Sequence, residues 1–403
     1  MGGQMVVERD LLARCGLRLN PIARGSLAAG FVRMVLGVTL ALALAACGQR
    51  EGVLIPVTMD AEAGAKVDML VATTRAPSTE PGVVFSGERG SSLSLANVVV
   101  SVPPNREVGS IQWPDRVPPD PTRTFAVTQI DPLTRKGATQ WFNGQPKNKR
   151  RVLLFVHGFN TRFDASVFRF AQFIHDTDSS LVPVLFSWPS RGRVTEYIYD
   201  RESTNFSRSD LATVLSEAAR SPHVEEVVVL AHSMGAWLTM EALRDLAMQN
   251  GRVPKKITNV ILASPDLDLD VFERQMRELG PKRPQISIFV DRNDRALGIS
   301  RLLAGQVTRV GAVDMTDPAY RSRLEGGDDI IVLDLTALRG GDALQHTRFA
   351  TTPEMVQLMG QKMMEGQMMS GQSMNGRVEG VDRVAEAMLL VASTPIEMFV
   401  GGR

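Results

Sequence analysis

The chain has 403 residues, of which 44% are hydrophobic and 22% are charged, and its formal net charge is +1. This length and composition predict a globular protein that buries a full core as one large or two smaller domains, and they exclude a disordered or fibrous chain. The near-zero net charge gives no reason to expect a nucleic acid or an acidic polymer as a partner.

Residues 1–47 are predicted to be a targeting segment. Several arginines precede an apolar stretch at residues 34–46, which is short for a membrane-spanning helix and typical of a signal peptide. The stretch ends in Leu44-Ala45-Ala46-Cys47, which resembles the lipobox of bacterial lipoproteins, so we expect Cys47 to be acylated. The alternatives are a signal peptide cut nearby and an uncleaved anchor. With Gly48 next, we expect an exported protein that is lipid-anchored in the cell envelope, on the periplasmic side of the outer membrane.

Cysteine and histidine usage argues against disulfides and metal centres. Cys15 lies in the segment that would be removed, which leaves Cys47 as the one thiol of the mature chain, so no disulfide can form in the monomer. The five histidines show no spacing of the HExxH type. We therefore predict no metal and no cofactor.

Residues 48–150 form a β-rich extension with proline-rich loops. Candidate strands lie at residues 67–71, 98–102 and 125–127. No recognisable catalytic set occurs here. We expect the extension to pack on the core or to shape one wall of a cleft.

Strands and helices alternate over residues 151–352, the predicted catalytic core. The pattern predicts an α/β domain with a mostly parallel sheet and helices on both faces. Expected strands are residues 152–156, 182–186, 227–231, 257–263, 286–290 and 330–335, and expected helices are residues 165–174, 211–219, 236–247 and 271–279. Catalytic groups in such sheets gather at the carboxyl ends of the strands.

The most informative segment is Ala231-His232-Ser233-Met234-Gly235, which follows an apolar run and precedes apolar residues at helical spacing. When a strand reverses into a helix within about two residues, the turning residue is strained, and only small flanking residues avoid a clash. Ala231 and Gly235 provide that room. The segment predicts a nucleophile elbow at Ser233 in an α/β-hydrolase fold. The alternative is an ordinary loop or helix-cap serine.

The first core strand ends in His157-Gly158-Phe159-Asn160, which resembles the His-Gly motif that α/β-hydrolases place beside the nucleophile. Attack on an acyl carbonyl leaves negative charge on its oxygen, and two fixed backbone N–H groups can stabilise that charge. We expect these groups to be those of Phe159 and Met234. The alternative is that the glycine only makes a turn.

A general base must accept the serine proton, and histidine has a suitable pKa. Among the five histidines, His346 alone lies in a loop after the last expected strand, as the chain order of nucleophile, acid and base in this fold requires. The acid is expected a few residues past the strand at residues 286–290. Asp294 is the first choice, and Asp291 and Asp266 are the alternatives.

Three other segments are given no catalytic role. Trp188 is expected to line an acyl pocket or to pack in the core. Residues 200–203 are expected to be charged surface or a helix start, and the alternative is a paired Asp and Arg near the cleft. Residues 353–403 are rich in methionine, glutamine and glycine. They are interpreted as a flexible or loosely helical tail, with a possible helix at residues 381–391.

Five motifs together resemble those of the bacterial α/β-hydrolase family DUF900, over about residues 66–350. They are Phe155-Val156-His157-Gly158-Phe159-Asn160-Thr161, Phe186-Ser187-Trp188-Pro189-Ser190, Ala231-His232-Ser233-Met234-Gly235, Ala263-Ser264-Pro265-Asp266 and Asp294-Arg295-Ala296-Leu297. The resemblance implies an esterase or lipase-like hydrolase without an established substrate.

These observations lead us to expect hydrolysis of a small-molecule or lipid acyl ester through an acyl-Ser233 intermediate. Thioesterase, amidase and peptidase activities stay open, because such residues set the bond type only loosely. The rival hypothesis is a non-catalytic envelope lipoprotein that uses a hydrolase scaffold for binding. The sequence indicates neither the substrate nor an oligomeric state.

Overall fold

The computed structural model describes residues 50–58, 64–146, 148–324, 329–338 and 341–364. The predicted signal peptide with Cys47, and the predicted helix at residues 381–391, lie outside these residues. The described chain from Glu51 onward belongs to one compact unit. No helix of the described chain is both long and apolar enough to cross a membrane.

One nine-stranded sheet organises the described chain, in the order β3-β2-β1-β5-β4-β6-β7-β8-β9. The pairs β1·β2 and β2·β3 are antiparallel, and all the other neighbours, including β1 and β5, are parallel. The strands are β1 Ala65–Pro77, β2 Phe85–Val102, β3 Ala126–Leu133, β4 Arg151–Val156, β5 Val182–Ser187, β6 Glu226–His232, β7 Ile257–Ala263, β8 Gln285–Val290 and β9 Ile330–Asp334.

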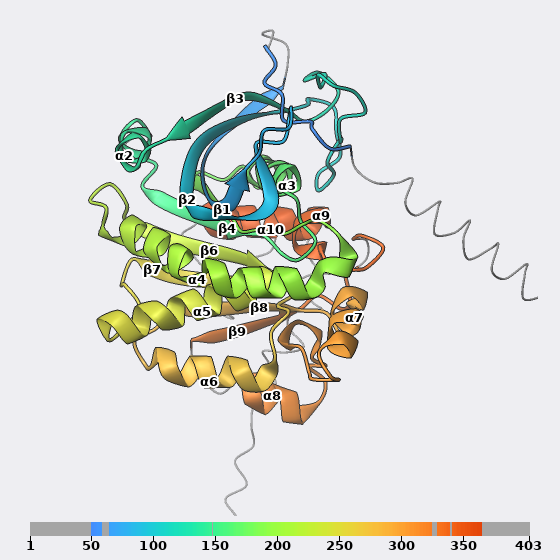
Figure 1. Cartoon of the computed structure of the whole chain (residues 1–403). Coiled ribbons are helices and arrows are strands. Elements are labelled where there is room, and N and C mark those ends of the chain that lie inside the picture. The colour runs from blue at the N-terminus through green and yellow to red at the C-terminus, as the bar shows by residue number, and fades with distance from the viewer. Residues whose placement is uncertain (1–49, 59–63, 147, 325–328, 339–340, 365–403) are drawn as a thin grey trace, which may run out of the picture. The chain divides into compact units, whose positions relative to one another are not determined.

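Helices cover both faces of this sheet (Figure 1). The helices are α2 Arg135–Asn143, α3 Phe163–Asp176, α4 Tyr197–Arg220, α5 Met234–Asn250, α6 Leu269–Leu279, α7 Arg295–Leu303, α8 Pro318–Leu324, α9 Arg348–Thr351 and α10 Pro353–Met364. Helices α4, α5 and α6 follow one another along one face, and α3 and α10 pack on the other (Figure 1). The predicted α/β class, with a mostly parallel sheet covered on both faces, is confirmed.

The central strands explain why both faces must be covered. In β4, Val152 and Leu154 enter the core beneath α4 and α5, whereas Leu153 and Phe155 enter the core beneath α3. Successive side chains of a strand point to opposite faces, so a strand that is apolar at every position needs helices on both sides. This continuous apolar pattern fixes β4 and β6 at the centre of the sheet.

The β-rich extension joins the catalytic core as part of the same sheet. Strand β1 pairs in parallel with β5, from Leu70 opposite Val184 to Thr73 opposite Ser187. The expected boundary at residue 150 therefore falls between strands of one sheet, immediately before β4 begins. Because β1 runs parallel to β5, its carboxyl end reaches the edge where the catalytic groups of such a fold gather.

The start of the methionine-rich tail is part of the core, which corrects the interpretation of residues 353–403 as an appendix as far as they are described. In α10, Met355, Val356 and Met359 are almost fully buried, and they pack with α3. Flexible methionine side chains fill irregular gaps well, so a tail-like composition here serves packing. The core of the described chain extends at least to Met359.

Candidate active site

Ser233 is the single residue between the end of β6 and the start of α5, and its backbone has φ 54° and ψ −122°. A non-glycine residue in this region is strained and persists only where its surroundings hold it. Its N–H donates to the Ala263 carbonyl at 3.0 Å, and its own carbonyl accepts from the Asp266 N–H at 3.1 Å. The side chain is thus presented at the carboxyl end of the central strand by a turn of the expected elbow type.

Two glycines let neighbouring backbones close on this turn. A Cβ at Gly235 would lie 2.3 Å from the His157 carbonyl oxygen, so the first turn of α5 is pressed against the end of β4. A Cβ at Gly158 would lie 2.9 Å from the Ser233 Cβ, so the loop after β4 packs directly on the serine. Ala231 is fully buried. The expected small residues are therefore required by close approach.

His157 anchors the loop after β4. Its ring stacks on Trp188 at a centroid distance of 4.8 Å, and its Nε2 accepts from the Trp188 N–H at 3.1 Å. Its Nδ1 faces the Gly158 carbonyl at 2.9 Å, which assigns the proton to Nδ1. Burial, and then the charge of Arg75, lower the pKa of His157 well below its usual value. His157 is a neutral structural group, and Trp188 is core.

The two expected oxyanion donors are the backbone N–H of Met234, the residue after Ser233, and that of Phe159, in the loop after β4. Neither N–H donates a hydrogen bond to another residue in the described ranges. The residue before Phe159, Gly158, packs closely against Ser233. The residue after it, Asn160, has a φ of 55°. The role of these two N–H groups as an oxyanion hole stays a prediction.

His346 and Asp294 form a short hydrogen bond from Nδ1 to Oδ2, at 2.6 Å. Asp294 is the N-cap of α7, and its other oxygen accepts from the Leu297 N–H at 3.0 Å. Burial alone would lower the pKa of His346. The hydrogen bond and the charge of Asp294 outweigh that effect, and the pKa is raised above its ordinary value of 6.5.

The two alternative acids have other partners. Asp266 accepts from Ser300 Oγ at 2.5 Å and pairs with Arg309 Nε at 3.1 Å. Asp291 pairs with Arg348 at 3.1 Å. The structure thus brings His346 together with Asp294 and not with Asp266 or Asp291, although Asp266 lies beside the backbone of the serine turn.

The loop that carries His346 is braced internally by Asp342 and contacts the residue before Ser233. Asp342 Oδ1 accepts from the His346 and Thr347 N–H groups at 2.9 and 2.8 Å. His232, the residue before the serine, lies 3.0 Å through Nε2 from the His346 carbonyl, and the two rings are 4.7 Å apart. The Ser233 hydroxyl itself has no hydrogen bond to any described residue. Catalytic hydrogen bonds often tighten only when substrate is bound.

Two charged residues near the site escaped the sequence analysis. Arg75 near the end of β1 and Asp200 on α4 are both fully buried. Of the two main expectations for residues 200–203, the helix start is confirmed, because α4 begins at Tyr197, and charged surface is wrong for Asp200. Asp200 lies on a buried face of α4 that is made of small polar residues, among them Ser203, Thr204 and Ser207. The spacing of hydrophobic residues therefore did not indicate that this part of the helix is buried. A signal for Arg75 was available, because this arginine directly continues a strand that is apolar on both faces.

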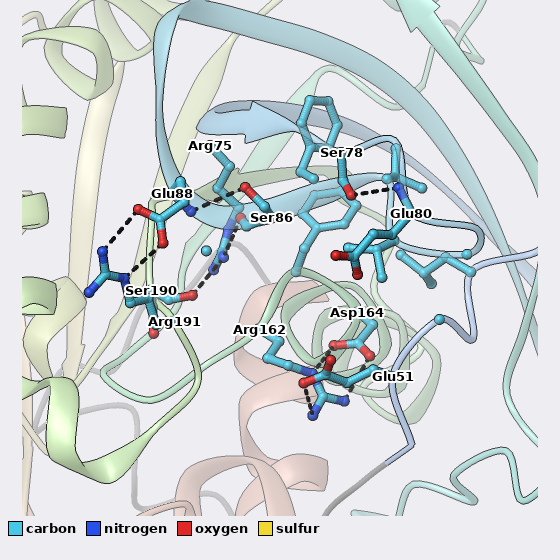
Figure 2. A pocket seen from close by; sticks show the side chains of 18 of the residues that line it. Glu51, Arg75, Ser78, Glu80, Ser86, Glu88, Arg162, Asp164, Ser190 and Arg191 are labelled. Atoms are coloured by element: carbon cyan, nitrogen blue, oxygen red, sulfur yellow. Dashed lines mark hydrogen bonds and ion pairs between the residues drawn. The ribbon is translucent and has the colours of Figure 1, made fainter.

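A polar cavity of about 420 Å³ has Arg75 and Ser190 among its lining residues (Figure 2). It contains none of Ser233, Asp294 and His346. Its charged walls are paired internally, as Figure 2 shows for Arg162 with Asp164 and for Arg191 with Glu88. Within the described ranges no group of three or more His, Cys, Asp and Glu side chains could hold a metal ion.

A strained serine between strand and helix, with a paired histidine and aspartate on later loops of the same sheet edge, defines an α/β-hydrolase. Residues 134–362 match the family described as alpha/beta hydrolases of unknown function, DUF900. The chain belongs to this family.

Other known proteins are more distantly similar. An uncharacterized protein of Nostoc sp. is 34% identical over 77 residues, which span 19% of this chain and 20% of that relative. Carboxylesterase CesB of Bacillus subtilis has a TM-score of 0.34 at 12% identity, over 55% of this chain and 86% of the other. A lipase-esterase related protein of Clostridium acetobutylicum has a TM-score of 0.31 at 10% identity, over 55% and 96%. These solved structures are hydrolases, and their likeness carries no information on the substrate.

Proposed function

We propose that the protein is a serine hydrolase that cleaves acyl esters through an acyl-Ser233 intermediate. The observation that carries the proposal is the 2.6 Å bond between His346 and Asp294, on a loop that contacts the residue before the strained serine. Serine hydroxyls are too weakly acidic to react unaided at neutral pH, and an oriented imidazole supplies the missing base. Phe159 and Met234 would hold the oxyanion.

The chemistry follows from these positions. His346 Nε2 accepts the Ser233 proton as Oγ bonds to the acyl carbon, and the carbonyl electrons move to oxygen beside the two free N–H groups. The tetrahedral intermediate collapses, the C–O bond to the alcohol breaks, and imidazolium returns its proton to the departing oxygen. Water then repeats the sequence on the acyl-enzyme, releasing the acid and restoring Ser233. Asp294 stabilises the imidazolium in both halves.

The test compares two matched serine variants in p-nitrophenyl butyrate hydrolysis. Ser264 follows the neighbouring strand β7 and shares the positive φ of Ser233, at 47°. We expect Ser233→Ala to lose at least about 10³-fold in kcat/KM, because the nucleophile is gone, and Ser264→Ala to retain turnover. A folded protein without turnover on esters, thioesters, amides or peptides would favour the non-catalytic binding scaffold.

The lipobox supports a second proposal, on location. We propose that Cys47 is acylated and anchors the protein in the bacterial envelope. Two or more acyl signals give stable membrane attachment, and lipoprotein-type cysteines carry several chains. Incorporation of an alkyne-tagged palmitate that is lost in Cys47→Ser supports this anchor, and equal incorporation in both proteins contradicts it.

A further inference from the structure

The loop that carries Phe159 has an external support. Asn160 has a left-handed backbone at φ 55°, a region that asparagine tolerates better than other non-glycine residues, and its N–H is held by Asp200 from outside the loop. The position of the Phe159 N–H depends on the shape of this loop. A displacement of about 1 Å in such a donor can cost about 100-fold in rate.

Arg75 supplies most of this support from the far side of the loop. Its guanidinium is fully buried and faces five polar atoms, of which His157 Nε2 is shared with the Trp188 N–H. The acceptors are Ser187 Oγ at 2.9 Å, the Ser86 carbonyl at 3.2 Å, the Ser190 carbonyl at 2.9 Å, His157 Nε2 at 3.3 Å and the Thr161 carbonyl at 2.7 Å. Two of these acceptors, His157 Nε2 and the Thr161 carbonyl, lie at the two ends of the loop that carries Phe159.

Asp200 holds the same loop from α4. Its Oδ2 accepts from the Asn160 N–H at 3.1 Å and from Ser190 Oγ at 2.6 Å. Ser190 Oγ in turn accepts from the Thr161 N–H at 3.0 Å. Figure 2 shows Arg75 and Ser190 side by side at the cavity wall. Burial lowers the pKa of Arg75 to about 10, with the charge of Asp200 opposing, so the guanidinium stays charged at neutral pH.

Because the Arg75 guanidinium bonds mainly to backbone carbonyls and to Ser187 inside the protein, its contacts serve the fold around the site. We propose that Arg75 is a positioning residue of the active site, which acts through the loop from His157 to Thr161 to place the Phe159 N–H for the oxyanion. This inference rests on the proposed function. It gives the β-rich extension a part in the reaction, because β1 carries the supporting side chain.

The experiment compares Arg75→Lys with Arg283→Lys. Lysine keeps the charge but cannot reproduce the planar five-donor fork. Arg283 is partly buried, pairs with Asp329 and donates to the Met276 carbonyl. It precedes β8 and so lies at the amino ends of the strands, whereas the site lies at their carboxyl ends. The rate of p-nitrophenyl butyrate hydrolysis is measured for each variant and divided by the number of active sites, which is determined by titration with a fluorophosphonate to completion. The melting temperature and the pH profile of each variant are measured as well.

We expect Arg75→Lys to lower kcat by about 10-fold to 100-fold while KM and the acidic limb of the pH profile stay unchanged, because the base and its partner are untouched. Arg283→Lys keeps kcat. A kcat for Arg75→Lys within twofold of that of Arg283→Lys overturns the inference. A purely structural role would instead lower the number of titrated sites and leave their kcat intact.

Ser190→Ala tests the same loop if Arg75→Lys does not fold, since it removes one hydroxyl and fills no space. The same kcat-specific loss, about 10-fold, is expected, and an unchanged kcat per site contradicts the inference. Absence of Ser233-dependent turnover in the unsubstituted protein would overturn the proposed function, and the positioning role with it. Normal turnover in Arg75→Lys overturns the positioning role alone.

Discussion

One oxygen of Asp294 lies 2.6 Å from His346 Nδ1, while the other accepts the Leu297 N–H at the start of α7. The carboxylate is therefore fixed by a helix before it orients the imidazole. The position of Asp294 is therefore set by the fold and does not depend on a bound substrate.

Replacing this acid should abolish most of the catalysis. We expect Asp294→Asn to lower kcat by about 10²–10⁴-fold, because the amide cannot stabilise imidazolium and can favour the wrong tautomer. Asp266→Asn and Asp291→Asn serve as comparisons, with melting temperatures to exclude unfolding. A larger kcat loss in either of these folded variants than in Asp294→Asn would contradict the assignment of the acid.

The pH dependence should report the raised pKa of His346. The base works only when neutral, so kcat/KM is low at acidic pH and rises as His346 loses its proton, with a midpoint above 6.5. Asp294→Asn removes the group that raises this pKa, so its residual activity should have a midpoint at lower pH. An acidic limb that stays in place in Asp294→Asn would show that another group sets it.

Gly235 should tolerate no side chain. A methyl group there would lie 2.3 Å from the His157 carbonyl oxygen and 2.7 Å from that of Val156, and neither backbone can move away cheaply. We expect Gly235→Ala to lower the free energy of unfolding by about 1–3 kcal/mol in urea denaturation. Gly298 on α7 has no atom within 4 Å of the added methyl, so Gly298→Ala should stabilise by about 0.5–1 kcal/mol. Equal effects of the two variants would contradict this packing.

Acid should destabilise the fold partly through His157. Its pKa is depressed in the folded protein, so below pH 6.5 the unfolded chain binds a proton that the folded one does not. Stability is therefore full above pH 6.5 and falls by about 1.4 kcal/mol per pH unit below it, until the folded group titrates. His157→Asn should be less stable at pH 7 but lose less between pH 7 and pH 5, as measured by urea unfolding. The exposed His223→Asn should match the unsubstituted protein at both pH values.

Local pattern predicted the sheet and the serine turn well, because both are encoded over a few neighbouring residues. The expected strand at residues 257–263 coincides with β7, and the strand-serine-helix transition is found where small residues flank Ser233. Partners across the fold were harder to predict. The choice among three aspartates depended on which loop His346 reaches, and periodicity does not encode that contact.

Features that depend on distant contacts were missed for a related reason. The first half of α4 buries small polar residues, so the hydrophobic period detected only its later turns. Arg75 acts on Thr161, 86 residues away, through a hydrogen bond that no local pattern records. The start of the methionine-rich tail has the composition of a loose segment, and only its packing with α3 makes it core.

Covalent labelling by a fluorophosphonate probe, followed by mass spectrometry of the modified peptide, tests the central claim most directly. We expect one modified residue, Ser233, with labelling lost in Ser233→Ala and retained in Ser264→Ala. Equal labelling of a folded Ser233→Ala variant, or modification at another serine of the unsubstituted protein, would contradict the assignment of Ser233 as the nucleophile.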